Sequence, residues 1–423
     1  MDWHEVSLRA EAEEQYLVDI LREMIRIDTS VPPGRNYEKF NDLVEPEFKR
    51  FGLKTQRVLV PDDTPKMAAE KLSGPRENLV ASLKNDLPKV SVYAHTDVVP
   101  ADSSWTYDPF GAEVVDGRLY GRGTVDDKGP IACVLGALKI IQEMGLAAKF
   151  DIDCLLCTDE EFGGHYTPGA DYLARNGYFS NHIIWLDLGA VDPIYTMGTA
   201  GSIQIDVRAV GKSCHSGMNF LGVNAIEQMV PILVELMALK EEVEQRQSRL
   251  DAFPHPQSPF AHGKMTPMFN LDIIHAGTKA NVVPAECVLT LNRRYIPDEN
   301  PDEVIAEIEE AIERGRKKSK LLDVQLKITR GYGAVELDTG TPAVRKMQEA
   351  IKAVKGWEGL LFGGMSGSSD LACVADALQP QKLDVAHFGV SRATDLRAHG
   401  ADEFVYIEDL VTVTKELVHY FCF

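Results

Sequence analysis

Residues 90–97 read VSVYAHTD, and this stretch decides the fold. Its first five residues predict a strand, and the polar residues after Ala94 predict the carboxyl end of that strand. A helix is predicted over residues 131–144, and two further strands over 154–157 and 183–186. Because strands alternate with helices, the sequence favours an α/β sheet with helices on both faces.

The order of elements changes near Gly198. The elements predicted after it are a strand around 203–207, a helix at 224–246, strands at 269–274 and 287–295, a helix at 301–317 and a strand at 324–329. This β-α-β-β-α-β order is that of a split βαβ, or ferredoxin-like, unit. Since the α/β pattern then resumes, we predict a discontinuous first domain, 1–197 with 334–423, and an inserted α+β domain at 198–333.

Composition narrows the possible partners and compartments. The chain has 423 residues and a formal net charge of −20, which argues against nucleic acid as a partner because phosphates attract basic surfaces. We see no secretory signal and no apolar run long enough for a bilayer, so a cytoplasmic protein without membrane contact is expected. The seven cysteines are scattered, as expected for reduced thiols. Cys154 and Cys157 would point to opposite faces of a strand, which favours core thiols over a metal site.

Polar side chains follow each predicted strand of the first domain, where ligands gather in open α/β sheets. They are His95 and Asp97, Glu160 and Glu161, and Asp187. Two predicted loops add further candidates: GRGTVDDKGP at 121–130 contains Asp126, and RAHGADE at 397–403 contains His399. Each of these residues alone would be ordinary on a solvated surface, so the prediction depends on their occurring together.

Together these segments offer histidine and carboxylate ligands for cations. A histidine can bind a metal while a nearby carboxylate, here Asp97, accepts its other N–H and fixes its tautomer. The two oxygens of Asp126 can bridge two cations. Of Glu160 and Glu161, one can bind a metal while the other takes a proton from a water. Such nitrogen and oxygen ligands suit Zn²⁺, Mn²⁺ or Co²⁺, so we predict two divalent ions about 3.5–4 Å apart.

These motifs, in this order, resemble the co-catalytic metallopeptidase and amidohydrolase family. That family contains acetylornithine deacetylase, succinyl-diaminopimelate desuccinylase, glutamate carboxypeptidase, aminoacylase and carnosinase. The resemblance runs from DTSVPPG at 28–34 to His399, nearly the whole chain. It implies a mixed-sheet, zinc-hydrolase-type catalytic domain with two divalent ions per subunit.

The resemblance also implies a role for each candidate residue. His95 becomes a ligand of one ion and His399 of the other, with Asp126 as the bridging carboxylate and a cis peptide to Asp127. The remaining roles are Asp97 as the group that orients His95, Glu160 as the general base, and Glu161 and Asp187 as further ligands.

The inserted domain resembles the lid through which members of the family form homodimers. GKSCHS at 211–216 matches the lid's histidine motif, in which His215 stabilises the developing oxyanion in its own or the partner's active site. Asn281, in NVVP at 281–284, also matches the family pattern, which implies that it contacts the substrate. Arg294 is expected to bind a substrate carboxylate, since a guanidinium suits that geometry, whereas a surface position is expected for Arg293.

One segment departs from the family pattern. Many relatives have a shorter G-G-T-S-D, whereas residues 363–370 here read GGMSGSSD. Because this loop lines the substrate pocket in the family, we expect substrate contacts from Gly364, Met365 and Ser366. Met365 could pack internally or contact an apolar or aromatic substrate.

We therefore expect a hydrolase that cuts an amide-type C–N bond of a small carboxylate-bearing substrate, as an N-acyl amino acid deacylase, dipeptidase or carboxypeptidase. One alternative is a metal-dependent aminohydrolase (deaminase) or carbamoyl amidohydrolase acting on a non-peptide amine, including an aromatic one. An alternative of another class is a non-catalytic binding protein on this fold. Suitable residues at every ligand position argue against the latter.

Overall fold

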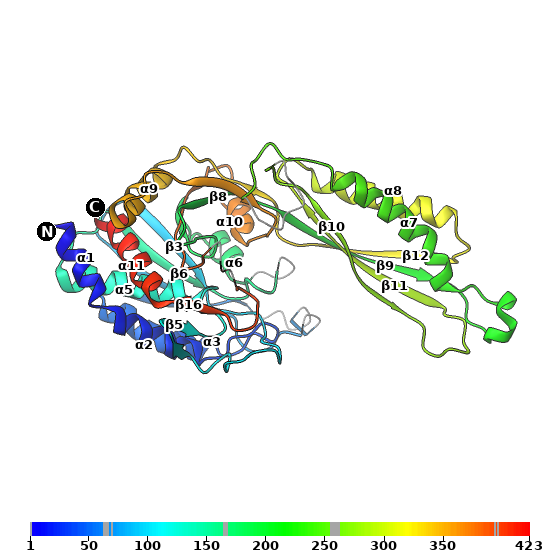
Figure 1. The fold of residues 1–423 in the computed structure, drawn as a ribbon, viewed down its shortest axis with the longest axis horizontal. Coiled ribbons are helices and arrows are strands. Elements are labelled where there is room, and N and C mark those ends of the chain that lie inside the picture. Colours follow the sequence, from blue (N-terminus) through cyan, green and yellow to red (C-terminus); the bar gives the residue numbers. More distant parts are fainter. Residues whose placement is uncertain are drawn as a thin grey trace. The chain divides into compact units, whose positions relative to one another are not determined.

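The structure, a computed structural model, describes residues 2–61, 67–68, 71–163, 168–253, 263–392, 395 and 397–423. The chain divides into two compact units. The first comprises Met1–Thr196, Leu337–Phe362 and Cys373–Phe423, and the second comprises Met197–Glu336 and Gly363–Ala372. Both ends of the chain therefore belong to the first unit (Figure 1).

A six-stranded mixed sheet lies at the centre of the first unit, in the order β1-β2-β6-β3-β7-β15. Its strands are β1 (Lys54–Leu59), β2 (Glu77–Leu83), β3 (Lys89–His95), β6 (Asp151–Cys157), β7 (His182–Trp185) and β15 (Asp384–His387). β3, β6, β7 and β15 are parallel to one another, whereas β2 is antiparallel to β1 and β6. His95 pairs with Cys157, so the parallel strands β3 and β6 end together and bring the residues after them to one edge.

Helices pack around this sheet. They are α1 (Trp3–Glu11), α2 (Glu14–Ile25), α3 (Tyr37–Arg50), α5 (Lys128–Met144), α6 (Ala170–Arg175), α9 (Pro342–Lys355) and α11 (Ile407–Cys422). Every side chain of α5 from Lys128 to Ile141 is buried, because α5 lies against β3 and also contacts α2 and α11 (Figure 1). Its sequence is correspondingly apolar on all sides.

Short elements complete the topology. β4 (Glu113–Val115), β5 (Arg118–Tyr120) and β16 (Phe404–Tyr406) form a three-stranded sheet, and β8 (Ile194–Thr199), β13 (Val335–Glu336) and β14 (Leu361–Met365) form another. The remaining helix, α10, spans Leu371–Ala377. β8 and β14 contain points at which the chain passes from one unit to the other.

In the second unit, four antiparallel strands form a sheet in the order β10-β11-β9-β12. The elements follow the chain as β9 (Gly201–Val210), η1 (Ser216–Leu221), α7 (Ala225–Val243), β10 (Met268–Ala276), β11 (Glu286–Tyr295), α8 (Pro301–Lys317) and β12 (Asp323–Arg330). Alternate residues of β9 and β11 are buried in one core with α7 and α8, as expected for a sheet with one covered face. This is the predicted β-α-β-β-α-β order.

The structure also differs from the sequence-based prediction. Apolar residues at helical spacing predict one helix over 7–27, but the structure has two helices there, α1 and α2. α3 continues through Pro46, although a proline can kink or end a helix. β1 and β2 were not predicted. β1 reads KTQRVL and alternates between exposed and partly buried positions, which is typical of an edge strand with charged residues rather than an apolar one.

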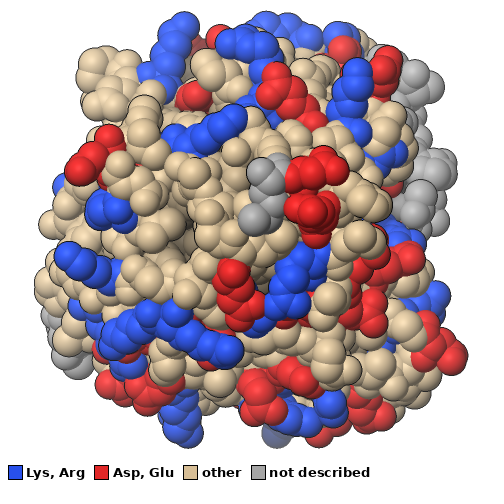
Figure 2. Space-filling view, turned by 90° about the vertical axis from the view of Figure 1, so that its left-hand side faces the viewer, with Lys and Arg blue, Asp and Glu red and all other residues tan. Residues whose placement is uncertain are grey.

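The surface carries both signs of charge. On the face drawn in Figure 2, acidic and basic side chains lie interspersed despite the net charge of −20. Among the described residues, none of the helices combines the length and the apolar character that crossing a membrane requires.

The core of the first unit gives a direct test of this packing. Leu21 in α2 is fully buried, whereas Leu8 in α1 is 51% exposed. Leu21→Ala is expected to destabilise the protein by about 2–5 kcal/mol, because it leaves a cavity, and Leu8→Ala by less than about 1 kcal/mol. Urea unfolding would measure both. Equal effects of the two substitutions would contradict the packing of α2.

Candidate dinuclear metal centre

The candidate ligands come from five separate segments of the first unit. His95 is the last residue of β3, Glu161 follows β6, and Asp187 follows β7. Asp126 lies in the loop before α5, and His399 in the loop before β16. Because β3, β6 and β7 are parallel, three of these residues emerge at the same edge of the sheet.

These side chains form two groups that share one carboxylate. His95 Nε2 lies 2.9 Å from Asp126 Oδ1 and 4.0 Å from Asp187 Oδ1. His399 Nε2 lies 3.1 Å from Asp126 Oδ2 and 2.9 Å from Glu161 Oε1. One oxygen of Asp126 thus faces each histidine. Within each group, the candidate ligand atoms lie within 4.8 Å of one another.

This donor set fits a pair of divalent cations. Ligand atoms bound tetrahedrally to Zn²⁺ at about 2.0–2.2 Å lie about 3.3–3.6 Å apart, and the observed separations of 2.9 to 4.0 Å bracket that value. Each group combines one imidazole with two carboxylates, a set that suits Zn²⁺, Co²⁺ or Mn²⁺. Asp126 is therefore in the position of a bridging ligand, and its peptide bond to Asp127 is cis, as the resemblance implied.

The charges within the cluster are strongly coupled. Hydrogen bonds to Asp126 and Glu161 raise the pKa of His399 to about 10. Burial disfavours a charged His95, but the carboxylates of Asp126 and Asp97 raise its pKa well above the ordinary value. Burial and the neighbouring Asp126 raise the pKa of Glu161 to about 7. The pKa shifts of both histidines favour protonated imidazoles beside these carboxylates, and bound cations would take the place of those protons.

Asp97 supports the cluster differently from the expectation. His95 Nδ1 lies 3.1 Å from the backbone carbonyl oxygen of Asp97 and 3.7 Å from its Oδ1. The carbonyl is therefore the acceptor at hydrogen-bond distance, whereas Asp97 Oδ2 accepts a bond of 2.9 Å from the backbone N–H of Glu161. The residue thus connects His95 on β3 to the loop after β6.

The sequence reasoning missed Arg122 and Glu403, which hold two of the ligand loops together. The buried carboxylate of Glu403 accepts hydrogen bonds from the backbone N–H groups of Gly123 and Val125 and pairs with Arg122 Nη1 at 2.7 Å. Arg122 Nη2 in turn donates to the carbonyl of His399 at 3.2 Å. Arg122 lies in GRGTVDDKGP with the ligand Asp126, and Glu403 lies in RAHGADE with the ligand His399. Their opposite charges, in the two ligand motifs, were the only sign in the sequence that they pair.

The expected general base lies beside the ligands in sequence. Glu160 is buried in the loop after β6, immediately before Glu161, and its carbonyl accepts a hydrogen bond from Gly163. Glu161 thus joins the ligand cluster, and Glu160 is its buried neighbour in the same loop.

The two arginines of β11 differ from each other. Arg294 is half-buried, and its Nη1 donates to Ser368 Oγ at 2.6 Å. Arg293 is fully buried and pairs with Glu299 at 2.6 Å and Glu307 at 3.8 Å. The surface position expected for Arg293 is therefore wrong, because its side chain lies on the face of β11 that packs into the core of the second unit.

Gly364 is another residue expected to contact the substrate, and the packing around it explains why this position is glycine. Its N–H donates to Asp251 at 2.7 Å, its carbonyl accepts from Phe253, and a Cβ on it would lie 2.0 Å from Met265 Sδ. These contacts explain why residue 364 is a glycine, with no need for a substrate contact. Met365 is exposed and Ser366 half-buried, both in the second unit.

His215 and Asn281 are also exposed residues of the second unit, and they lie close together. The carbonyl of Asn281 accepts a hydrogen bond from the N–H of Ser216, the residue after His215. The histidine motif and the Asn281 segment thus form one surface.

Comparison with known proteins gives consistent results. Residues 91–421 match the profile of peptidase family M20/M25/M40. Succinyl-diaminopimelate desuccinylase of Gluconobacter oxydans (strain 621H) is 29% identical over 81% of this chain and 83% of its own. N-formyl-4-amino-5-aminomethyl-2-methylpyrimidine deformylase of Bacillus subtilis (strain 168) is 26% identical over 99% of this chain and 97% of its own. The crystal structure of human carnosine dipeptidase 1 has a TM-score of 0.78 at 18% identity, covering 99% of this chain and 98% of that chain.

The mixed α/β fold, the ligand cluster and these relatives define a metal-dependent hydrolase that acts on C–N bonds. The chain belongs to peptidase family M20/M25/M40, whose profile matches well over half of its length. The family predicted from the motifs is thereby confirmed.

The shared carboxylate leads to a prediction about metal content. The parent protein is expected to hold about two ions per chain. Asp187→Asn should reduce this to about one, because Asp187 belongs to a single group, whereas Asp126→Ala should leave fewer than one. Elemental analysis after dialysis would measure the ratio.

The control is Asp116→Asn, at an exposed turn between β4 and β5, which should keep both ions. An Asp126→Ala protein that still holds two ions would rule out a bridging role for Asp126.

Proposed function

We propose that the chain hydrolyses the amide bond of a small, carboxylate-bearing substrate, as an N-acyl amino acid deacylase, dipeptidase or carboxypeptidase. The observation that carries this proposal is the shared Asp126, which joins two histidine–carboxylate groups, one of them containing Glu161, the residue after Glu160. The printed names of the relatives describe a desuccinylase, a deformylase and a dipeptidase, which supports an acyl–nitrogen bond as the target.

In the proposed mechanism Glu160 moves the proton. The metal ions, when bound, would lower the pKa of a water and polarise the acyl oxygen. We assign His95, Asp126, Asp187, Glu161 and His399 as the residues that hold the ions. Glu160 accepts the proton of the attacking water and later returns it to the departing nitrogen, a role worth about 10²–10⁴-fold in rate. Zn²⁺ is the proposed metal, with Mn²⁺ and Co²⁺ as alternatives for the same donors.

We assign the oxyanion donor to His215, in its own or the partner's active site. His215 Nδ1 accepts a hydrogen bond of 3.0 Å from the N–H of Gly217. A neutral imidazole that accepts at Nδ1 carries its proton at Nε2, so this side chain is prepared to donate to developing negative charge. The half-buried guanidinium of Arg294 is the proposed partner of the substrate carboxylate.

We also propose that residues 198–333 act as a lid domain through which two chains form a homodimer. Half-exposed apolar residues recur along one face of α7, at Ile226, Val230, Val234 and Met237. Phe220 in η1, before α7 in the chain, is 78% exposed, and the edge strand β10 has the exposed residues Ile273 and Ile274. An apolar surface of this extent is typical of a protein interface.

We propose a cytoplasmic location because the cysteines form no disulfides. All seven are free thiols, and Cys154 and Cys157 are buried in β6. Free thiols in this number are typical of a reducing compartment.

A second candidate is a hydrolase acting on a non-peptide aromatic amine. The Bacillus subtilis deformylase aligns with 99% of this chain, and its name describes a formylated aminopyrimidine. A panel of N-acyl amino acids, dipeptides and N-formyl heteroaromatic amines, assayed for released amine or ammonia, would separate the two candidates.

Glu160→Gln tests the chemistry. The substitution removes the proton acceptor but not a ligand, so kcat should fall by about 10²–10⁴-fold while both metal ions remain bound. Steady-state kinetics with elemental analysis would measure this. Glu113→Gln, an exposed change in β4, is the control. Unchanged turnover in Glu160→Gln would refute the assignment of Glu160 as the base. If the chain is a non-catalytic binding protein, the substitution should leave ligand binding unchanged.

The double substitution Val230→Lys with Val234→Lys tests the homodimer. Charges on the exposed face of α7 should convert the dimer into a monomer at micromolar concentration, because they cannot be buried unpaired. Light scattering after gel filtration would report the mass. Leu59→Lys with Leu322→Lys, at two positions each 60% exposed outside α7, should leave the dimer intact. A persistent dimer in the α7 variant would place the interface elsewhere.

A further inference from the structure

A buried cluster of Tyr37, Arg76 and Asp159 lies next to the proposed base in sequence. The three residues are at most 2% exposed. The Tyr37 hydroxyl donates to Asp159 Oδ1 at 2.6 Å, and Arg76 Nε lies 2.9 Å from Asp159 Oδ2. Both oxygens of the buried carboxylate therefore have partners, and these come from α3 and the segment before β2.

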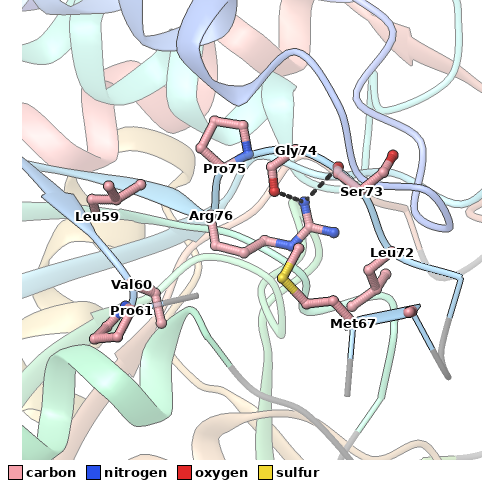
Figure 3. A pocket seen from close by; sticks show the side chains of 10 residues that line it. Leu59, Val60, Pro61, Met67, Leu72, Ser73, Gly74, Pro75 and Arg76 are labelled. Carbon is pink, nitrogen blue, oxygen red and sulfur yellow. Dashed lines mark hydrogen bonds between the residues drawn. The ribbon is translucent and has the colours of Figure 1, made fainter. Parts of the chain in front are cut away.

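The rest of the Arg76 guanidinium is bound by backbone carbonyls. Nη2 donates to Pro33 at 2.9 Å. Nη1 donates to Ser73 at 3.2 Å and to Gly74 at 3.4 Å (Figure 3). Arg76 also lines an apolar pocket of about 570 Å³. Since its nitrogens are engaged within the protein, Arg76 acts as an anchor for Asp159 and not as a ligand for a substrate in that pocket.

Gly34 packs directly against the Tyr37, Arg76 and Asp159 side chains. Its φ is +69°, and a Cβ there would lie 2.9 Å from both Arg76 Nη2 and Asp159 Oδ1 and 3.0 Å from the Tyr37 hydroxyl. The position therefore requires glycine both for its left-handed backbone and for space. This explains the end of the DTSVPPG segment, to which the proposed chemistry assigns no role.

The backbone of Asp159 also turns the chain just before Glu160. Its φ is +59°, in the left-handed region that residues other than glycine seldom occupy. Glu160 follows directly, and the N–H of Glu161 is held by Asp97 Oδ2 at 2.9 Å. Glu160 thus lies between two residues that are each fixed by other segments of the first unit.

We propose that Asp159, held by Tyr37 and Arg76, is a positioning residue that aims the carboxylate of Glu160 at the water it deprotonates. This inference rests on the proposed role of Glu160. Displacing a catalytic group by about 1 Å can reduce the rate about 10²-fold. A buried ion pair is weak support for stability, but it fixes the geometry of the loop on which the base depends.

Tyr37→Phe is the test, because it removes one hydroxyl and leaves the ion pair in place. We expect kcat to fall by about 10–100-fold, as for other groups that orient an active site, with KM changed less than about 3-fold and both metal ions retained. The matched control is Tyr195→Phe, which removes a buried hydroxyl that donates to the Val385 carbonyl at 3.0 Å. It should lower stability to a similar extent and leave kcat within about 2-fold.

A double-mutant cycle separates positioning from a purely structural role. In the Glu160→Gln background, Tyr37→Phe should change kcat by less than about 2-fold, because its effect acts through Glu160. The proposal is overturned if Tyr37→Phe alone leaves kcat within 2-fold of the parent, or if it produces its full effect again without Glu160. Full activity of Glu160→Gln would overturn the proposed function as well. An inactive Glu160→Gln with an active Tyr37→Phe would overturn only the positioning role.

Discussion

The close approach of three carboxylates at one sheet edge is the constraint on which the site depends. Asp126 belongs to both ligand groups, Asp187 to one and Glu161 to the other, and within each group the ligand atoms lie within 4.8 Å of one another. Carboxylates this close repel each other unless positive charge lies between them. Two imidazoles supply it within the chain, as the raised pKa values of His95 and His399 indicate. Divalent cations would supply it more strongly.

Buried ion pairs hold the ligand loops in place around this cluster. Glu403 and Arg122 tie the backbone before Asp126 to the carbonyl of His399. Arg76 and Asp159 form a second pair, in which Asp159 is the residue directly before Glu160. Burying such pairs contributes little to stability compared with apolar packing, but it gives a single geometry. The loops that carry the chemistry are thus ordered by charge, whereas the sheet and helices beneath them are ordered by apolar burial.

Much of this architecture is readable from the sequence. The strand ending at His95, the β-α-β-β-α-β order of the second unit and the bounds of α8 follow from local periodicity and flanking turn residues. Prediction failed where the pattern was weak. The charged edge strand β1 has no apolar run. Arg293 has no local sign of burial, because its partners Glu299 and Glu307 lie in the turn after β11 and in α8.

The sequence alone determined which residue types follow each strand, and hence the candidate ligands and the family. Only the tertiary structure decided that Asp126 presents one oxygen to His95 and the other to His399, that the carbonyl of Asp97 is the acceptor for His95 Nδ1, and that Gly34 lies against Asp159. The reason is physical: periodicity reports how a residue relates to its neighbours along the chain. Distances between side chains from different segments are instead set by how those segments pack.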